Sequence, residues 1–268
     1  MRARQLLAFI AVSSCAATVI DGVPPPSRSI HRVLFIGNSL TYVNDLPATV
    51  AALARDNGDS LVASMAAGPN LALIDHLTGG SNALQLLRDS SWDAVVLQQG
   101  PTTTAMCRDS MVLWTGMFAP LIQRAGGVSM TLMAWPAIST GDVWEQAHTT
   151  AVLAAASVHG ILVPAGDAWR TALLTHPDVR LYSDDGYHPS ALGSFLTALV
   201  VYQRITGRDP RTLKAHAYAS GAPLAIDRAT LSWLAAAAAA ANAATPATPS
   251  APAPVPPALP DAVGANRC

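Results

Sequence analysis

A serine between a predicted strand and a predicted helix is the first feature of the sequence that can do chemistry. Ser39 lies in Gly37-Asn38-Ser39-Leu40-Thr41, directly after an apolar run. In open parallel α/β sheets such loops present side chains to ligands, and the helix that follows offers free N–H groups. Ser39 is therefore placed to attack a carbonyl carbon, although a serine or threonine here also serves as an ordinary cap of a turn.

A histidine with a nearby aspartate supplies the base that such a serine needs. In Asp185-Gly186-Tyr187-His188-Pro189, the aspartate precedes the histidine by three residues across a glycine-containing turn. This spacing lets the carboxylate accept the Nδ1 proton and leaves Nε2 free to face a serine. Asp184 is a rival for the same role, but its spacing is one residue too long, which favours a solvated turn residue. Alone, the pair also fits an ordinary loop; with Ser39 it predicts a nucleophilic site.

These two segments resemble a known family. Gly37–Thr41 resembles the first sequence block of the SGNH (GDSL-like) hydrolases, in the GNS variant of the GDS pattern, and Asp185–Pro189 resembles their last block. The resemblance extends from Arg32 to Gly207, with the blocks in the family's order. It implies a flavodoxin-like three-layer α/β sandwich around a central parallel sheet of about five strands. It also implies Ser39 as nucleophile, His188 as general base and then acid, Asp185 as its orienter, and no metal or organic cofactor.

The family's oxyanion hole maps onto this sequence unevenly. Its three donors are the N–H of the serine, the N–H of a glycine after the second strand, and an asparagine side chain after the third. Ser39 supplies the first, and Gly68 lies where the second is expected. Thr102 stands at the position where the family has the asparagine. We expect Gln99 to replace it, because its amide can donate in the same way. Strand alternation lets only one of Gln98 and Gln99 face the site easily, and the sequence alone does not decide which.

The elements that must position these residues follow from the alternation of short apolar runs with longer helical stretches, which is typical of βα repeats around a parallel sheet. We predict strands at Arg32–Ile36, Ser60–Met65, Asp93–Gln98, Val128–Ala134 and Ile161–Pro164. We predict helices at Leu46–Asn57, Leu84–Arg88, Asp109–Ala125, Asp142–His159, Asp167–Leu174, Pro189–Thr206 and Arg228–Ala243.

Three further side chains lie near the predicted site. Trp135, after the fourth strand, would wall a substrate pocket or, as is commoner for tryptophan, belong to the core. Asn44 follows the nucleophile closely enough to touch substrate. Asp45 is expected to cap the helix that Pro47 begins.

Composition narrows the class of protein. The chain has 268 residues, of which 51% are hydrophobic and 12% charged, as in a globular protein with one sizeable domain. The formal net charge is −1, from 16 Lys+Arg and 17 Asp+Glu, and no basic stripe is present. We therefore expect no nucleic-acid partner. The 3 cysteines lack the spacing of a metal site, and whether Cys107 and Cys268 pair or stay reduced is left open.

The N-terminal residues 1–17 read as an export segment, with a short positive region followed by the apolar run Leu6–Val12. Val12–Cys15 resembles a bacterial lipobox, in which Cys15 would be lipidated and attach the protein to a membrane; ordinary cleavage after Ala16 or Ala17 is the alternative. The protein is therefore expected to be periplasmic, extracellular or membrane-anchored. We assign residues 31–243 to the hydrolase domain and 244–268 to a disordered tail rich in proline and alanine.

The predicted activity is hydrolysis of acyl esters, most simply short-chain or acetyl esters, through a Ser-His-Asp acyl-enzyme. By resemblance, the ester would be carried by a carbohydrate or a lipid. Two alternatives remain: an acyltransferase that uses the same three residues, and a surface lipoprotein that keeps the fold as a binding module without turnover. The sequence leaves the oligomeric state open.

Overall fold

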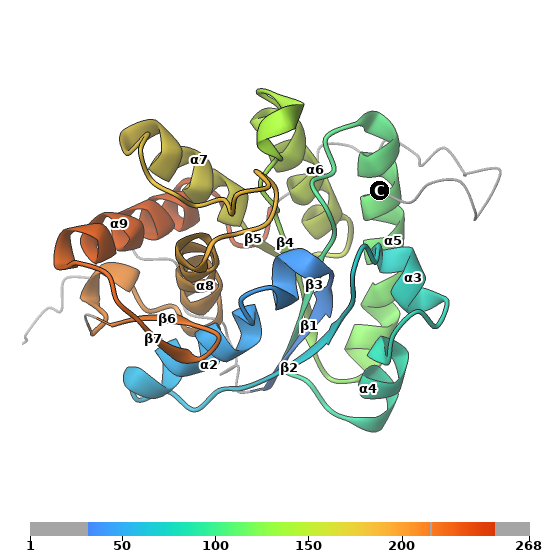
Figure 1. Ribbon diagram of the computed structural model, residues 1–268. Coiled ribbons are helices and arrows are strands. Elements are labelled where there is room, and N and C mark those ends of the chain that lie inside the picture. The colour runs from blue at the N-terminus through green and yellow to red at the C-terminus, as the bar shows by residue number, and fades with distance from the viewer. Residues whose placement is uncertain (1–31, 215, 250–268) are drawn as a thin grey trace, which may run out of the picture.

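A parallel sheet forms the centre of the molecule. The computed structural model describes residues 32–214 and 216–249. Within them, five strands pair in the order β2-β1-β3-β4-β5 (Figure 1). These are β1 (Arg32–Gly37), β2 (Val62–Ala67), β3 (Ala94–Gln98), β4 (Val128–Leu132) and β5 (Ile161–Val163). Both ends of each strand lie within three residues of the predicted ends. The strands could be predicted because a parallel sheet covered on both faces is built from continuous apolar runs.

Helices cover both faces of this sheet, and side chains alternate between them along β1. Val33 and Phe35 are fully or almost fully buried in the cluster formed with one set of helices. Figure 1 shows this set on one side of the sheet: α2 (Leu46–Asp56), α7 (Ala165–Thr175), α8 (Ala191–Thr206) and, outside them, α9 (Arg228–Ala244). Leu34 and Ile36 pack into the cluster on the other face. That face carries α3 (Leu73–Leu77), α4 (Ala83–Asp89), α5 (Ala105–Arg124) and α6 (Trp144–Ser157). The predicted three-layer fold class is thus confirmed.

Several element boundaries differ from the predictions, for local reasons. Helix α5 begins at Ala105 instead of Asp109, because the hydroxyl of Thr104 accepts a hydrogen bond from the N–H of Cys107. Helix α8 begins at Ala191, after Pro189, because Ser190 is its N-cap.

Short elements were not predicted at all. They are α1 (Ser39–Tyr42), α3, the 3₁₀ helices Ile138–Thr140 and Pro210–Thr212, and the hairpin of β6 (Ala217–Ala219) and β7 (Ala222–Leu224). None of them is long enough to show a hydrophobic period.

The residues after α9 remain in contact with the domain. The N–H of Leu162, on the edge strand β5, donates to the carbonyl of Ala247 at 2.7 Å. Arg204 on α8 donates to the carbonyl of Thr245 at 2.8 Å. Two residues of the range assigned to a disordered tail therefore pack on the sheet domain. The edge strand gains from this contact, since its outer backbone groups otherwise lack partners.

Other predictions fall on parts of the chain outside the described residues. These are the export segment 1–17, lipidation of Cys15, and the tail from residue 250 onward, including Cys268. Cys107 is disulfide-bonded. None of the described helices has the length and apolar character that a bilayer crossing requires. Within the same residues, no group of three or more His, Cys, Asp and Glu side chains is arranged to hold a metal ion.

Candidate functional site

The nucleophile loop is built at the carboxyl end of β1, which pairs with β2 on one side and with β3 on the other. Asn38 is the N-cap of α1, and its side-chain oxygen accepts from the N–H of Leu40 at 3.1 Å. Ser39 is the first residue of that short helix and is 5% exposed. Its own N–H lies at a helix start, where no intrahelical acceptor exists. The loop thus presents both a hydroxyl and an N–H at the sheet edge.

The structure brings Ser39, His188 and Asp185 into one hydrogen-bonded chain. The Oγ of Ser39 lies 2.8 Å from Nε2 of His188, although the two residues are 149 positions apart. Nδ1 of the same imidazole lies 2.5 Å from Oδ2 of Asp185. With Nδ1 donating to the carboxylate, Nε2 is free to accept the serine proton. Asp184, the rival orienter, is exposed, and Nδ1 of His188 hydrogen-bonds Asp185 instead.

The carboxylate of Asp185 is held by its own loop. Its Oδ1 accepts from the backbone N–H groups of Tyr187 and His188, both at 2.9 Å, and from the hydroxyl of Ser183 at 2.7 Å. These hydrogen bonds, the one from the His188 ring first among them, hold the pKa of Asp185 well below its usual range. Asp185 is therefore ionised near neutral pH and fixes the orientation of the imidazole. Ser183 was not singled out in the sequence; a hydroxyl two residues before the aspartate is its only local signal.

Trp135 holds the same loop from the core side. It is 1% exposed and stacks on Trp169 with ring centroids 3.7 Å apart. Its indole N–H donates to the carbonyl of Tyr187 at 3.1 Å. Trp135 thus belongs to the core and does not wall a pocket. Gly186 completes the turn with a φ of +67°, a conformation that favours glycine.

Asn44 links the two loops of the site. Its side-chain amide donates to the carbonyl of Pro189 at 2.9 Å and to the hydroxyl of Ser194 at 3.0 Å. It therefore ties the nucleophile segment to the start of α8. Asp45 caps α2 as predicted, accepting from the N–H of Ala48 at 3.1 Å.

Gly68 and the two glutamines lie at the same edge of the sheet. Ala67, the last residue of β2, pairs with Gly37, so Gly68 is level with the nucleophile loop. A Cβ at Gly68 would come within 2.8 Å of Leu71 Cδ1, so the loop packs closely there. Gln98 and Gln99 are each 2% exposed.

The two glutamines have different partners. Oε1 of Gln98 accepts from the N–H of Asn38 and from the hydroxyl of Thr41, both at 2.9 Å. Oε1 of Gln99 accepts from the N–H of Leu73, at the start of α3, at 2.9 Å. Because these backbone donors require an oxygen, both amides are fixed in orientation. Both Nε2 groups are buried and have no hydrogen-bond partner among the described residues. The amide donors of both glutamines, at the end of β3, therefore have no acceptor among the described residues.

A buried histidine supports the end of β1 and was missed in the sequence. Nε2 of His76 lies 3.1 Å from the carbonyl of Gly37, and Nδ1 lies 2.6 Å from the hydroxyl of Ser81. Burial lowers the pKa of His76. A neutral ring that donates from Nε2 and accepts at Nδ1 satisfies both contacts. His76 lies in α3, which is too short to be predicted from hydrophobic spacing.

Comparison with known proteins rests on structure. No protein-family model and no curated protein matches the sequence. A proposed SGNH hydrolase from Slackia heliotrinireducens superposes with a TM-score of 0.57 at 24% identity, over 65% of this chain and 98% of that one. A DUF4886 family protein from Bacteroides uniformis gives 0.62 at 17% identity, over 79% and 94%. TesA gives 0.50 at 16% identity, over 64% and 96%. The chain therefore has the fold of the SGNH hydrolases.

Proposed function

We propose that the protein is a serine hydrolase that cleaves short-chain acyl esters through an acyl-enzyme, with Ser39 as nucleophile, His188 as base and Asp185 as its orienter. One observation carries the proposal: Ser39 Oγ lies 2.8 Å from His188 Nε2, while the opposite ring nitrogen is hydrogen-bonded to an ionised carboxylate. This is the geometry that activates a serine. The SGNH-type fold supports the same reading.

The reaction follows from these contacts. His188 takes the hydroxyl proton as Ser39 Oγ bonds to the ester carbonyl carbon, and the ionised Asp185 stabilises the imidazolium that forms. The imidazolium then gives the proton to the departing alcohol as the C–O bond breaks. Water attacks the acyl-serine in the second half, with His188 again as base, and releases the acid and free Ser39. No step needs a metal or an organic cofactor.

The negative charge on the carbonyl oxygen needs donors, and we assign these to the N–H groups of Ser39 and Gly68 and to the amide of Gln99. Gln99 follows β3 directly, and its unpartnered Nε2 supports the assignment. Gln98 already accepts two hydrogen bonds from the nucleophile loop, which fits a role in holding that loop. A donor held in place before the reaction stabilises the oxyanion without reorganisation.

The decisive experiment is turnover of p-nitrophenyl acetate by the full chain and by Ser39→Ala, together with labelling by a fluorophosphonate probe. We expect turnover and labelling in the wild type and neither in the variant. Ser129→Ala is the matched control, because Ser129 is also buried but lies in β4, one residue after its first residue, Val128. Equal turnover by Ser39→Ala would reject the mechanism.

Two alternatives use the same observations differently. An acyltransferase would pass the acyl group to an alcohol, so an added acceptor alcohol would accumulate as a new ester. A binding module without turnover is favoured by the absent asparagine, since Thr102 stands at that position. A folded protein that resists the fluorophosphonate probe would support that module over both enzymes.

A further inference from the structure

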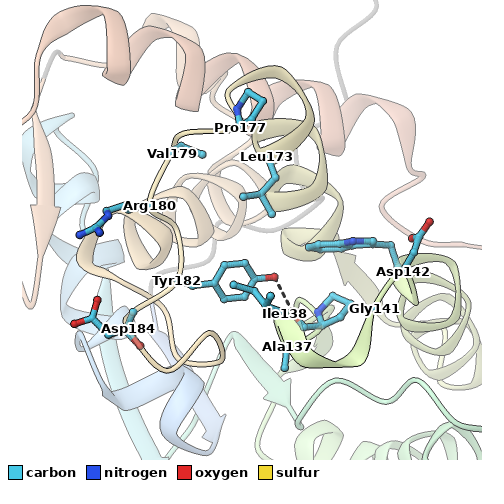
Figure 2. A pocket seen from close by; sticks show the side chains of 13 residues that line it. Ala137, Ile138, Gly141, Asp142, Leu173, Pro177, Val179, Arg180, Tyr182 and Asp184 are labelled. Atoms are coloured by element: carbon cyan, nitrogen blue, oxygen red, sulfur yellow. Dashed lines mark hydrogen bonds between the residues drawn. The ribbon is translucent and has the colours of Figure 1, made fainter.

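The two halves of the candidate site have different supports. On the histidine side, the N–H of Ile138 donates to the carbonyl of Gly186 at 2.9 Å. Figure 2 shows Ile138 and Tyr182 among the residues that line a groove of about 500 Å³ on this side. The hydroxyl of Tyr182 donates to the carbonyl of Pro136 at 2.7 Å, the hydrogen bond drawn there as a dashed line. Among the described residues that line this groove, none is an assigned oxyanion donor. Other parts of the chain therefore position the donors.

The three assigned donors come from three separate segments. Ser39 follows β1, Gly68 follows β2 and Gln99 follows β3. The pairing of β1 with β2 ends at Gly37 and Ala67, so the sheet no longer fixes the spacing of the two chains beyond this pair. The distance between the first two donors then depends on contacts between the segments that follow the strands.

The Gly68 segment, which we define as residues 68–77, is held together by its own hydrogen bonds. The carbonyl of Gly68 accepts from the N–H of Leu71 at 3.4 Å. Oδ2 of Asp75 accepts from the N–H of Ala72 at 2.9 Å, at the start of α3. Helix α3 has 5 residues, and a helix this short is not stable without contacts to the rest of the protein. The position of the whole segment is thus set from outside it.

Two hydrogen bonds join the Gly68 segment to the segments that carry the other donors. The side-chain amide of Asn38, the residue before Ser39, donates to the carbonyl of Leu71 at 3.2 Å. The N–H of Leu73 donates to Oε1 of Gln99 at 2.9 Å. Each of these bonds links one donor segment to another.

His76 supplies a third link, from α3 to the end of β1. Its side chain is 0% exposed, and its Nε2 lies 3.1 Å from the carbonyl of Gly37, the last residue of that strand. Because a carbonyl oxygen only accepts, Nε2 carries a proton. In the neutral ring Nδ1 then accepts from the hydroxyl of Ser81, 2.6 Å away. The two contacts together select one tautomer and hold α3 against the strand that ends at the nucleophile loop.

We propose that His76 is a positioning residue of the oxyanion hole, whose hydrogen bond to Gly37 sets the distance between the N–H groups of Gly68 and Ser39. The proposal rests on the esterase function proposed above. Such donors act when they lie roughly 2.7–3.1 Å from the oxyanion, and a displacement of about 1 Å at a catalytic site costs up to about 10²-fold in rate. Since the oxyanion forms only in the transition state, the loss falls on kcat and not on KM.

The test measures kcat and KM for p-nitrophenyl acetate, and the rate of inactivation by a fluorophosphonate, with the full chain. His76→Leu removes the donor and keeps a side chain of similar size. We expect kcat and the inactivation rate to fall by about 10- to 100-fold, with KM changed by less than about twofold. His76→Gln retains an N–H near the place of Nε2 and should restore kcat to within about threefold of the wild type.

Two further variants keep a loss of stability apart from a loss of positioning. Asn242→Ala is the matched control, because its buried amide donates to the carbonyl of Val200 at 3.2 Å, in the helix layer on the other face of the sheet. It should lower the unfolding free energy and leave kcat unchanged. Ser81→Ala is a milder change than His76→Leu, for use if that variant does not fold. It removes the donor to Nδ1, and we expect kcat to fall by about threefold or more with KM unchanged.

The outcomes separate this proposal from the esterase function itself. An active wild type together with folded His76 and Ser81 variants of wild-type kcat would overturn the positioning role. So would a rise in KM at constant kcat, or an equal loss of kcat in Asn242→Ala at equal destabilisation. A wild type that neither hydrolyses p-nitrophenyl acetate nor reacts with the fluorophosphonate at Ser39 would instead remove the proposed function, and the positioning role with it.

Discussion

The loop before α8 and the pair of helices α6 and α7 each hold a histidine that is hydrogen-bonded through Nδ1 to an aspartate. In the loop, His188 contacts Asp185 at 2.5 Å. Between the helices, His148 contacts Asp167 at 2.8 Å. The two pairs differ in what lies at the other ring nitrogen: Nε2 of His188 faces the hydroxyl of Ser39, whereas no described nucleophile is hydrogen-bonded to His148. Whether a His–Asp pair is a candidate general base therefore depends on the group that contacts the other ring nitrogen of the histidine.

The surroundings of the two carboxylates differ as well. Asp185 accepts two backbone N–H groups and a serine hydroxyl in addition to the imidazole, all from its own turn. The same two helices carry a second ion pair, in which Arg170 on α7 contacts Glu145 on α6 at 2.5 Å. That arrangement bridges two helices, which is a common role for surface charges. The first pair is preorganised for proton transfer, and the second joins two elements.

Replacing each histidine gives the largest expected contrast. His188→Ala should reduce kcat on p-nitrophenyl acetate by about 10⁶-fold, because removal of the base disables the group as a unit. His148→Ala should change kcat by less than about twofold, since surface substitutions rarely perturb a distant site. Steady-state kinetics on both purified variants measures this. A comparable loss in both would show that the two pairs are not functionally distinct.

Replacing each aspartate sharpens the comparison. Asp185→Asn should lower kcat by about 10⁴-fold, because an amide no longer fixes the tautomer with Nε2 unprotonated. Asp167→Asn should leave kcat nearly unchanged. Steady-state kinetics at matched protein concentrations compares kcat of the two variants. If Asp185→Asn retained wild-type turnover, orientation by Asp185 would not be required.

Two glutamine variants test which side chain donates to the oxyanion at the site that contains His188. Gln99→Leu removes the amide that we assign to the oxyanion, and we expect a loss of about 10²–10³ in kcat. Gln98→Leu removes an acceptor for Asn38 N–H and Thr41 Oγ, and we expect it to lower stability as well as turnover, because a buried donor then lacks a partner. Denaturant unfolding alongside kinetics separates the two. A larger kcat loss without destabilisation in Gln98→Leu would transfer the donor role to Gln98.

The sequence predicted what local pattern determines. The strands are continuous apolar runs, and the two motifs around Ser39 and His188 are each contained within a few residues. Ser39 closely follows β1, at the carboxyl edge of a parallel sheet where ligands bind. The segment with His188 lies between α7 and α8, and the resemblance to the SGNH hydrolases predicted that it meets Ser39 there. Hence the fold class and the convergence of the two loops could be predicted.

Contacts between distant segments could not be predicted in the same way. The orientation of Gln98 and Gln99 depends on N–H groups of Asn38 and Leu73, which come from other strands' loops. The role of Trp135 depends on the carbonyl of Tyr187, 52 positions away. The contact of Ala247 with β5 depends on the edge strand lacking an outer neighbour. Each of these contacts depends on how distant segments pack together, and such packing produces no hydrophobic period or motif in the sequence.

The smallest expected effect concerns the stability that the helix-bridging pair supplies. The hydrogen bond to Asp167 raises the pKa of His148 above its ordinary value of 6.5. A raised pKa in the folded state means that the stabilisation is fully present below about pH 6.5 and is lost as the pH rises through the folded value. Its size should stay below about 1 kcal/mol, because the pair is partly exposed.

Urea unfolding of the wild type and of His148→Gln at pH 5.5 and pH 9 measures this contribution. The difference in unfolding free energy between the two proteins should be larger at pH 5.5, because the Asp167 carboxylate attracts the protonated ring more strongly than the neutral one. The double variant His148→Gln/Asp167→Asn should show no further pH-dependent loss, since both partners of the pair are then absent. An equal difference at both pH values would mean that the pair holds α6 and α7 by packing alone.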